Sequence, residues 1–114
     1  MIDHPEREPE FVQDMVVAGE TIQRYAKGGK QAFLASEMAR DAIIRQFLVM
    51  GEAARRLSEA TRTANPQVPW RSIMTLRNRL VHGYDEIEVD RLWDIIGTSL
   101  KEALPELRRL KERL

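Results

Sequence analysis

Apolar residues recur at spacings of three and four along most of this chain, and that period restricts the chain to helices. The pattern runs through residues 9–26, from about 31 or 36 to 61, through 70–82, and onward from 86–90. No sustained two-residue alternation and no Asn-Gly or Asp-Gly turn indicates a strand. The sequence therefore predicts an all-α fold, an antiparallel bundle of four to five helices.

Glycine and proline mark the expected ends of these helices. Gly28 and Gly29 close the first helix, and Pro69 suits the first turn of the third. Pro105 is expected to split off or kink a last basic segment. The second helix is apolar over much of its girth, so it is expected to pack against more than one neighbour. Gly51 lies inside it, where glycine costs about 1 kcal/mol relative to alanine, and either a close helix crossing or chance explains its presence.

Composition limits the function classes that suit the chain. Its 114 residues fit one domain, read as an acidic, proline-containing tail (residues 1–10) followed by a helical domain (residues 11–114). Eighteen basic and 18 acidic residues cancel, so a nucleic-acid partner would need a local basic patch. The chain has no cysteine, no apolar run long enough to span a bilayer and no signal-peptide pattern, which favours the cytoplasm.

The third helix breaks its own apolar pattern. Arg77 falls in the middle of a stripe made by Trp70, Ile73, Met74, Leu80 and Val81. A guanidinium there needs a carboxylate partner or a polar cleft, because an unpaired buried charge is costly. The pattern alone leaves two interpretations open, a structural ion pair and a functional site.

His82 lies five residues after Arg77, about 140° round an ideal helix. The two side chains can share a site if the helix unwinds at Gly83 or if a second chain contributes. A histidine in a last helical turn is also favoured simply because the helix dipole there prefers positive charge. Asn78 lies between the two in angle and could orient either. Tyr84 follows Gly83, so its hydroxyl is either exposed or carried by a packed ring.

Residues 77–84, RNRLVHGY, resemble the R-x-x-x-x-H-x-Y motif of the HepT-like toxins in the HEPN ribonuclease superfamily. The likeness extends over about residues 11–114 and includes the stretches IQRYAKGG, GEAARRL, PQVPWRSI and RNRLVHGYDEIEVDRLWDII, in the family's order.

The resemblance implies an all-helical homodimer whose motifs meet near a cleft between chains. It implies a metal-independent endoribonuclease without a cofactor, with Arg77 and His82 catalytic and Asn78 supporting. It also implies a type VII-like toxin–antitoxin system. There a nucleotidyltransferase of the MNT type, the antitoxin, silences the toxin by transferring AMP to Tyr84.

These residue types suit RNA cleavage. Histidine titrates near neutrality and can act as general base or acid, while arginine stays charged and grips phosphate oxygens. His82 is the one credible catalytic histidine, so a two-histidine mechanism would need two chains. We expect a 2′,3′-cyclic phosphate product from RNA, with tRNA and mRNA both possible substrates.

Two other functions remain open from the sequence. The first is a non-catalytic helical dimer that acts as a protein-binding module, in which Arg77 merely bridges a carboxylate. The second is a nucleic-acid-binding protein that uses a basic end, namely Arg108, Arg109, Lys111 and Arg113. The zero net charge argues against the second, because such charge runs are more often solvated helix faces.

Overall fold

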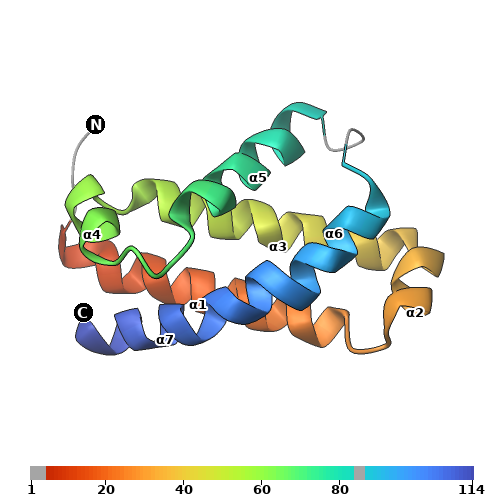
Figure 1. Ribbon diagram of the computed structural model, residues 1–114, viewed down its shortest axis with the longest axis horizontal. Helices are drawn as coiled ribbons and strands as arrows, with labels where there is room; N and C mark the ends of the chain where they lie inside the picture. The colour runs from red at the N-terminus through yellow and green to blue at the C-terminus, as the bar shows by residue number, and fades with distance from the viewer. Residues whose placement is uncertain (1–4, 84–86) are drawn as a thin grey trace.

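Successive long helices run antiparallel and pack side by side around one apolar core (Figure 1). The computed structural model describes residues 5–83 and 87–114. The long elements are α1 (Glu8–Tyr25), α3 (Glu37–Arg56), α5 (Trp70–Gly83) and a continuous run of α6 (Val89–Ile95), π-helical η3 (Ile96–Leu100) and α7 (Lys101–Arg113). Shorter turns are η1 (Pro5–Arg7), α2 (Lys30–Ala35) and α4 (Glu59–Ala64). No strand occurs in the part of the chain described, and the predicted all-α class is confirmed.

Helix α3 forms the centre of the molecule. It packs on α1 along one side and on α5 along another, with Ile43, Phe47 and Met50 buried between them. This confirms that the wide apolar stripe serves more than one neighbour. Helix α7 covers the far side of α1 and buries Leu104 and Leu107 completely.

The second of the two starts expected for the long helix is confirmed, because α3 begins directly after Ser36 and α2 is a separate helix before it. The end expected near residue 61 is wrong, because the chain breaks at Leu57 and continues as α4. The backbone leaves helical geometry at Ser36 and again at Leu57. The hydroxyl of Ser36 accepts the Ala39 N–H at 3.0 Å, and that of Ser58 accepts the Thr61 N–H at 3.1 Å. Each serine therefore caps a new helix start, a use that serine fulfils better than most residues.

Pro105 does not split the C-terminal segment. It lies inside α7, which runs unbroken from Lys101 to Arg113. A proline at this position removes one helical hydrogen bond, to the carbonyl of Lys101. The buried Leu104 and Leu107 flank it and hold this part of α7 against α1, so packing outweighs the local penalty.

Residues 8–10, expected in the tail, belong to α1. The carboxylate of Glu8 is largely buried and accepts hydrogen bonds from the Ser58 N–H at 2.9 Å and the Thr61 hydroxyl at 2.5 Å. Burial alone would raise the pKa of Glu8, but these hydrogen bonds outweigh it and lower the pKa below its ordinary value. The start of α1 is thereby tied to α4.

Helix α5 lies across α3, and its C-terminal half rises away from the other helices (Figure 1). It makes few direct contacts with α6, η3 or α7, so both of its flanks border hollows. Within residues 5–83 and 87–114, no helix has the length and apolar character needed to cross a bilayer.

Candidate active site

Arg77 lies directly over Gly51, at a close crossing of α5 on α3. A Cβ added to Gly51 would lie 2.2 Å from the Cβ of Arg77 and 2.5 Å from its Cγ. Any side chain at position 51 would force the two helices apart, so only glycine suits this crossing. The close-crossing explanation for Gly51 is confirmed, and the crossing sets how near Arg77 lies to α3.

The guanidinium of Arg77 is paired but still reaches solvent. Its Nη2 lies 3.4 Å from Oε2 of Glu52, and its Nη1 donates to Oδ1 of Asn78 at 3.1 Å. The Arg77 side chain retains 25% exposure, so the guanidinium is neither fully buried in the core nor fully exposed on the surface. Asn78, expected to orient either motif residue, contacts Arg77.

Glu52 is the site residue to which sequence reasoning assigned no role. Besides Arg77, its carboxylate pairs with Arg55 at 2.8 Å and Arg56 at 3.4 Å. The hydrogen bond from Arg55 lowers the pKa of Glu52 below its ordinary value, assisted by the charges of all three arginines and opposed by partial burial. Glu52 therefore stays ionised near neutral pH. The sequence feature that could have indicated a role for Glu52 is its place in the stretch GEAARRL, directly after Gly51 of the helix crossing.

An open hollow of about 380 Å³ adjoins this ion cluster, between α1, α3 and α5. Its charged lining residues are Arg45, Arg56, Arg77, Asp14 and Glu52, and its apolar ones are Phe11, Leu48, Val49, Ala53 and Val81. Among the described lining residues the cations exceed the anions by one, so this part of the hollow favours an anionic group.

His82 lies in the last turn of α5, and its side chain is exposed. It is not among the described residues that line the hollow beside Arg77. Helix α5 continues to Gly83, so the helix does not unwind before His82 to turn it toward Arg77. Within one chain the two motif residues therefore face different directions, as the spacing of 140° predicts. Tyr84, the proposed AMP acceptor, lies outside the described residues.

Two of the four cations at the basic C-terminal end are paired with carboxylates. Arg108 pairs with Glu20 and Arg109 with Glu106, each at 2.9 Å. Arg113 donates a hydrogen bond to the side-chain oxygen of Asn65 at 2.7 Å. The two ion pairs reduce the positive charge that this end offers a nucleic acid, which weakens the interpretation of this end as a binding surface. Among described residues, no three histidine or carboxylate side chains gather in a way that could hold a metal ion.

Comparison with known proteins places this chain in a family. The model of the family described as "Ribonuclease HepT-like" matches residues 15–114. A protein of Thermococcus cleftensis named a probable ribonuclease HepT is 27% identical over 106 residues, 92% of this chain and 93% of the relative. A protein of Methanocaldococcus jannaschii named as an RNase is 31% identical over 100 residues, 87% of this chain and 88% of the relative.

A third relative, an RNase-named protein of Caldanaerobacter subterraneus subsp. tengcongensis, is 31% identical over 94 residues, 82% of this chain and 80% of the relative. No solved structure gives a significant match. The family match covers the crossing at Gly51, the Arg77–Glu52 pair and His82 alike. The chain belongs to the HepT-like ribonuclease family.

Proposed function

We propose that this chain is an endoribonuclease toxin that cleaves RNA without a metal ion, using Arg77 and His82. The observation that carries the proposal is Arg77 itself, a paired guanidinium held at the edge of an open hollow. An arginine with a purely structural role could be buried completely. The guanidinium of Arg77 is instead partly exposed, so an RNA phosphate could contact it. Membership in the HepT-like family supports the same assignment.

The chemistry follows from the two residue types. His82, as general base, takes the proton of an RNA 2′-hydroxyl, and the 2′-oxygen attacks the adjacent phosphorus. The bond from phosphorus to the 5′-oxygen breaks, and the same His82, now an imidazolium, gives the proton that it took to that leaving oxygen. Arg77 stabilises the negative charge that builds on the phosphate oxygens. The products are a 2′,3′-cyclic phosphate and a free 5′-hydroxyl.

A homodimer would bring the two groups together. Within one chain His82 is directed away from the hollow beside Arg77, so we propose that the imidazole at each site comes from the partner subunit. A two-fold axis would form two equal sites, each with one arginine and one histidine. Asn78, hydrogen-bonded to Arg77, is proposed to fix the orientation of the guanidinium.

Cleavage in the presence of EDTA tests the proposed function. Incubated with tRNA or mRNA and excess EDTA, the purified chain is expected to cut at an undiminished rate, because no step of this mechanism uses a metal ion. The new 3′ ends should carry cyclic phosphate, which mass spectrometry of the fragments detects. No cutting of either RNA, or cutting that stops with EDTA and returns with magnesium, would contradict the proposal.

We further propose that a nucleotidyltransferase antitoxin of the MNT type silences the enzyme through Tyr84. The phenolic oxygen of Tyr84 attacks the α-phosphorus of ATP, AMP is transferred to the tyrosine, and pyrophosphate leaves. Tyr84 is two residues from His82, so the added phosphate would repel RNA phosphates from the imidazole.

Intact-mass measurement tests this modification. After incubation with the cognate nucleotidyltransferase and ATP, the chain is expected to gain the mass of one or more AMP groups and to lose RNA cleavage. Tyr84→Phe should gain nothing. Tyr25, the other tyrosine, is 46% exposed, so Tyr25→Phe is a matched control that should gain as the wild type does. An equal gain in Tyr84→Phe would place the modification elsewhere.

A further inference from the structure

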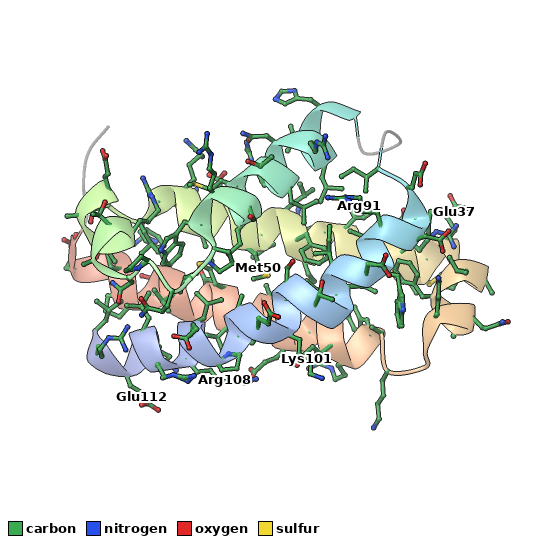
Figure 2. All side chains as sticks on the ribbon, in the orientation of Figure 1. Glu37, Met50, Arg91, Lys101, Arg108 and Glu112 are labelled. Carbon is green, nitrogen blue, oxygen red and sulfur yellow. The ribbon has the colours of Figure 1, made fainter. Side chains whose placement is uncertain are left out.

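A second groove borders the opposite flank of α5, between α5 and the run of α6, η3 and α7. Its volume is about 390 Å³, within the range of pockets that hold small ligands. Phe47 and Met50 of α3 contribute to its floor, together with Leu100 and Ala103, and Figure 2 shows Met50 beneath the gap between α5 and the α6–α7 run. The proposed mechanism uses none of these residues.

The charged residues in the described lining of this groove are all positive. Three arginines line it, Arg71 and Arg79 from α5 and Arg91 from α6, and its described lining contains no aspartate or glutamate. None of the three forms an ion pair with a described carboxylate, whereas Arg56 and Arg77, which line the hollow on the other flank of α5, both pair with Glu52. In a chain of zero net charge, this is the local cationic patch that a nucleic-acid partner would require.

The groove also offers an apolar surface and hydroxyl groups beside its cations. Partly exposed Ile73, Leu76, Ile87 and Ile95 form apolar walls, and Ser72, Thr75 and Ser99 add hydrogen-bonding groups. Single-stranded nucleic acids need this combination, because phosphates pair with guanidinium groups while a base rests on an apolar or aromatic surface.

His82 lies closer in direction to this groove than to the hollow beside Arg77. On an ideal helix His82 lies about 20° from Arg71 and about 20° from Thr75. Arg79 lies about 60° from His82, whereas Arg77 lies about 140° away. An RNA strand lying along Arg71, Thr75 and Arg79 would therefore run toward the exposed imidazole at the end of α5.

A second copy of the chain fits this groove poorly. A two-fold contact would place the same surface on both sides and set arginine against arginine. Like charges across an interface oppose association unless anions intervene. These three arginines, which pair with no carboxylate of residues 5–83 and 87–114, instead favour a polyanion.

We propose that the groove between α5 and the α6–η3–α7 run is a subsite that binds single-stranded RNA and directs it to His82. This inference rests on the proposed ribonuclease function and names where the substrate lies. Arg71, Arg79 and Arg91 contact its phosphates, and the apolar walls receive a base.

Binding of an RNA that cannot be cut tests the subsite on the intact protein. The probe is a fluorescein-labelled 2′-O-methyl oligouridylate, which lacks the nucleophile, and fluorescence anisotropy gives its Kd over a range of salt concentrations. The double substitution Arg71→Ala with Arg91→Ala is expected to weaken binding about tenfold. It should also make the dependence of log K on log salt shallower by about 1.4, because each lost phosphate contact with a single strand contributes about 0.7.

The matched control is Lys101→Ala with Lys111→Ala, which removes the same charge from exposed positions on α7. Figure 2 shows Lys101 on the edge of the molecule away from α5, and this control should bind within about twofold of wild type. Thermal melting confirms that both double variants are folded.

Unchanged affinity and salt dependence in the groove variant would overturn the subsite. So would loss of nucleotidyltransferase binding with RNA affinity intact, which would make the groove a protein-docking surface. A separate cleavage assay of the wild-type chain tests the ribonuclease function itself. Absence of cutting there would contradict the proposed function, whatever the RNA-binding result.

Discussion

Replacing His82 with alanine is expected to lower the rate of RNA cleavage by about 10²–10⁴-fold, the usual contribution of one general acid–base group. The melting temperature should stay within a degree or two of wild type, because the side chain is exposed and lies in a terminal helical turn. Single-turnover cleavage of a labelled RNA and a thermal melt measure the two quantities.

The chain offers its own control for this substitution. It contains two histidines, so His4→Ala removes an imidazole from a segment to which no catalytic role is assigned. That variant should cut RNA at the wild-type rate. Wild-type cutting by His82→Ala would mean that the proton transfers belong to another group, and the proposed mechanism would fail.

Replacing Arg77 with alanine should give a folded chain whose cleavage rate has fallen by about 10²–10³-fold, as when one preorganised charge donor is lost. Alanine keeps the Cβ that lies over Gly51. Glu52 retains Arg55 and Arg56, so no carboxylate is left unpaired. A partly exposed ion pair contributes at most about 1 kcal/mol, and the melting temperature should fall by only a few degrees.

Arg55→Ala is the matched control, because it removes another partner of Glu52 and should leave cleavage unchanged. The alternative function, a protein-binding module with a structural arginine, predicts the opposite result for Arg77→Ala, an unfolded protein. Circular dichroism and cleavage measured on the same sample decide between them.

Mixing the two inactive variants examines the proposed arrangement across the two-fold axis. In a mixed dimer of Arg77→Ala and His82→Ala chains, one of the two sites would receive an intact arginine and an intact histidine from different chains. About half of the activity per mixed dimer should return. If both groups came from the same chain, mixing would restore nothing, and the assignment of His82 to the partner's site would be abandoned.

Periodicity alone gave the helical class and the main helices, because α1, α3 and α5 each bury an apolar stripe that the 3.6-residue period shows directly. It left the start at Ser36 as one of two alternatives and missed the break at Leu57, since the apolar pattern continues past the local capping hydrogen bonds of Ser36 and Ser58. It allowed Pro105 to split off the last segment, because the loss of one hydrogen bond was considered without the packing of α7 on α1.

For the candidate site too, the sequence predicts the features within one helix but not the contacts between helices. The angle between Arg77 and His82 is a property of one helix and was predictable from five residues of spacing. The Glu52 partner and the arginine-lined groove depend on how α3, α5 and α6 are placed relative to one another. Sequence spacing within one helix carries no information about that placement.

The crossing at Gly51 has a consequence for how such chains diverge. The crossing demands the smallest residue at position 51. At position 77 the atoms nearest to it are Cα, Cβ and Cγ, which many residues possess. A descendant could exchange its guanidinium for another side chain and keep the same architecture. Catalysis would then be lost without a change in the backbone structure. Inactive homologues would be recognised by the residue at position 77 and not by their fold.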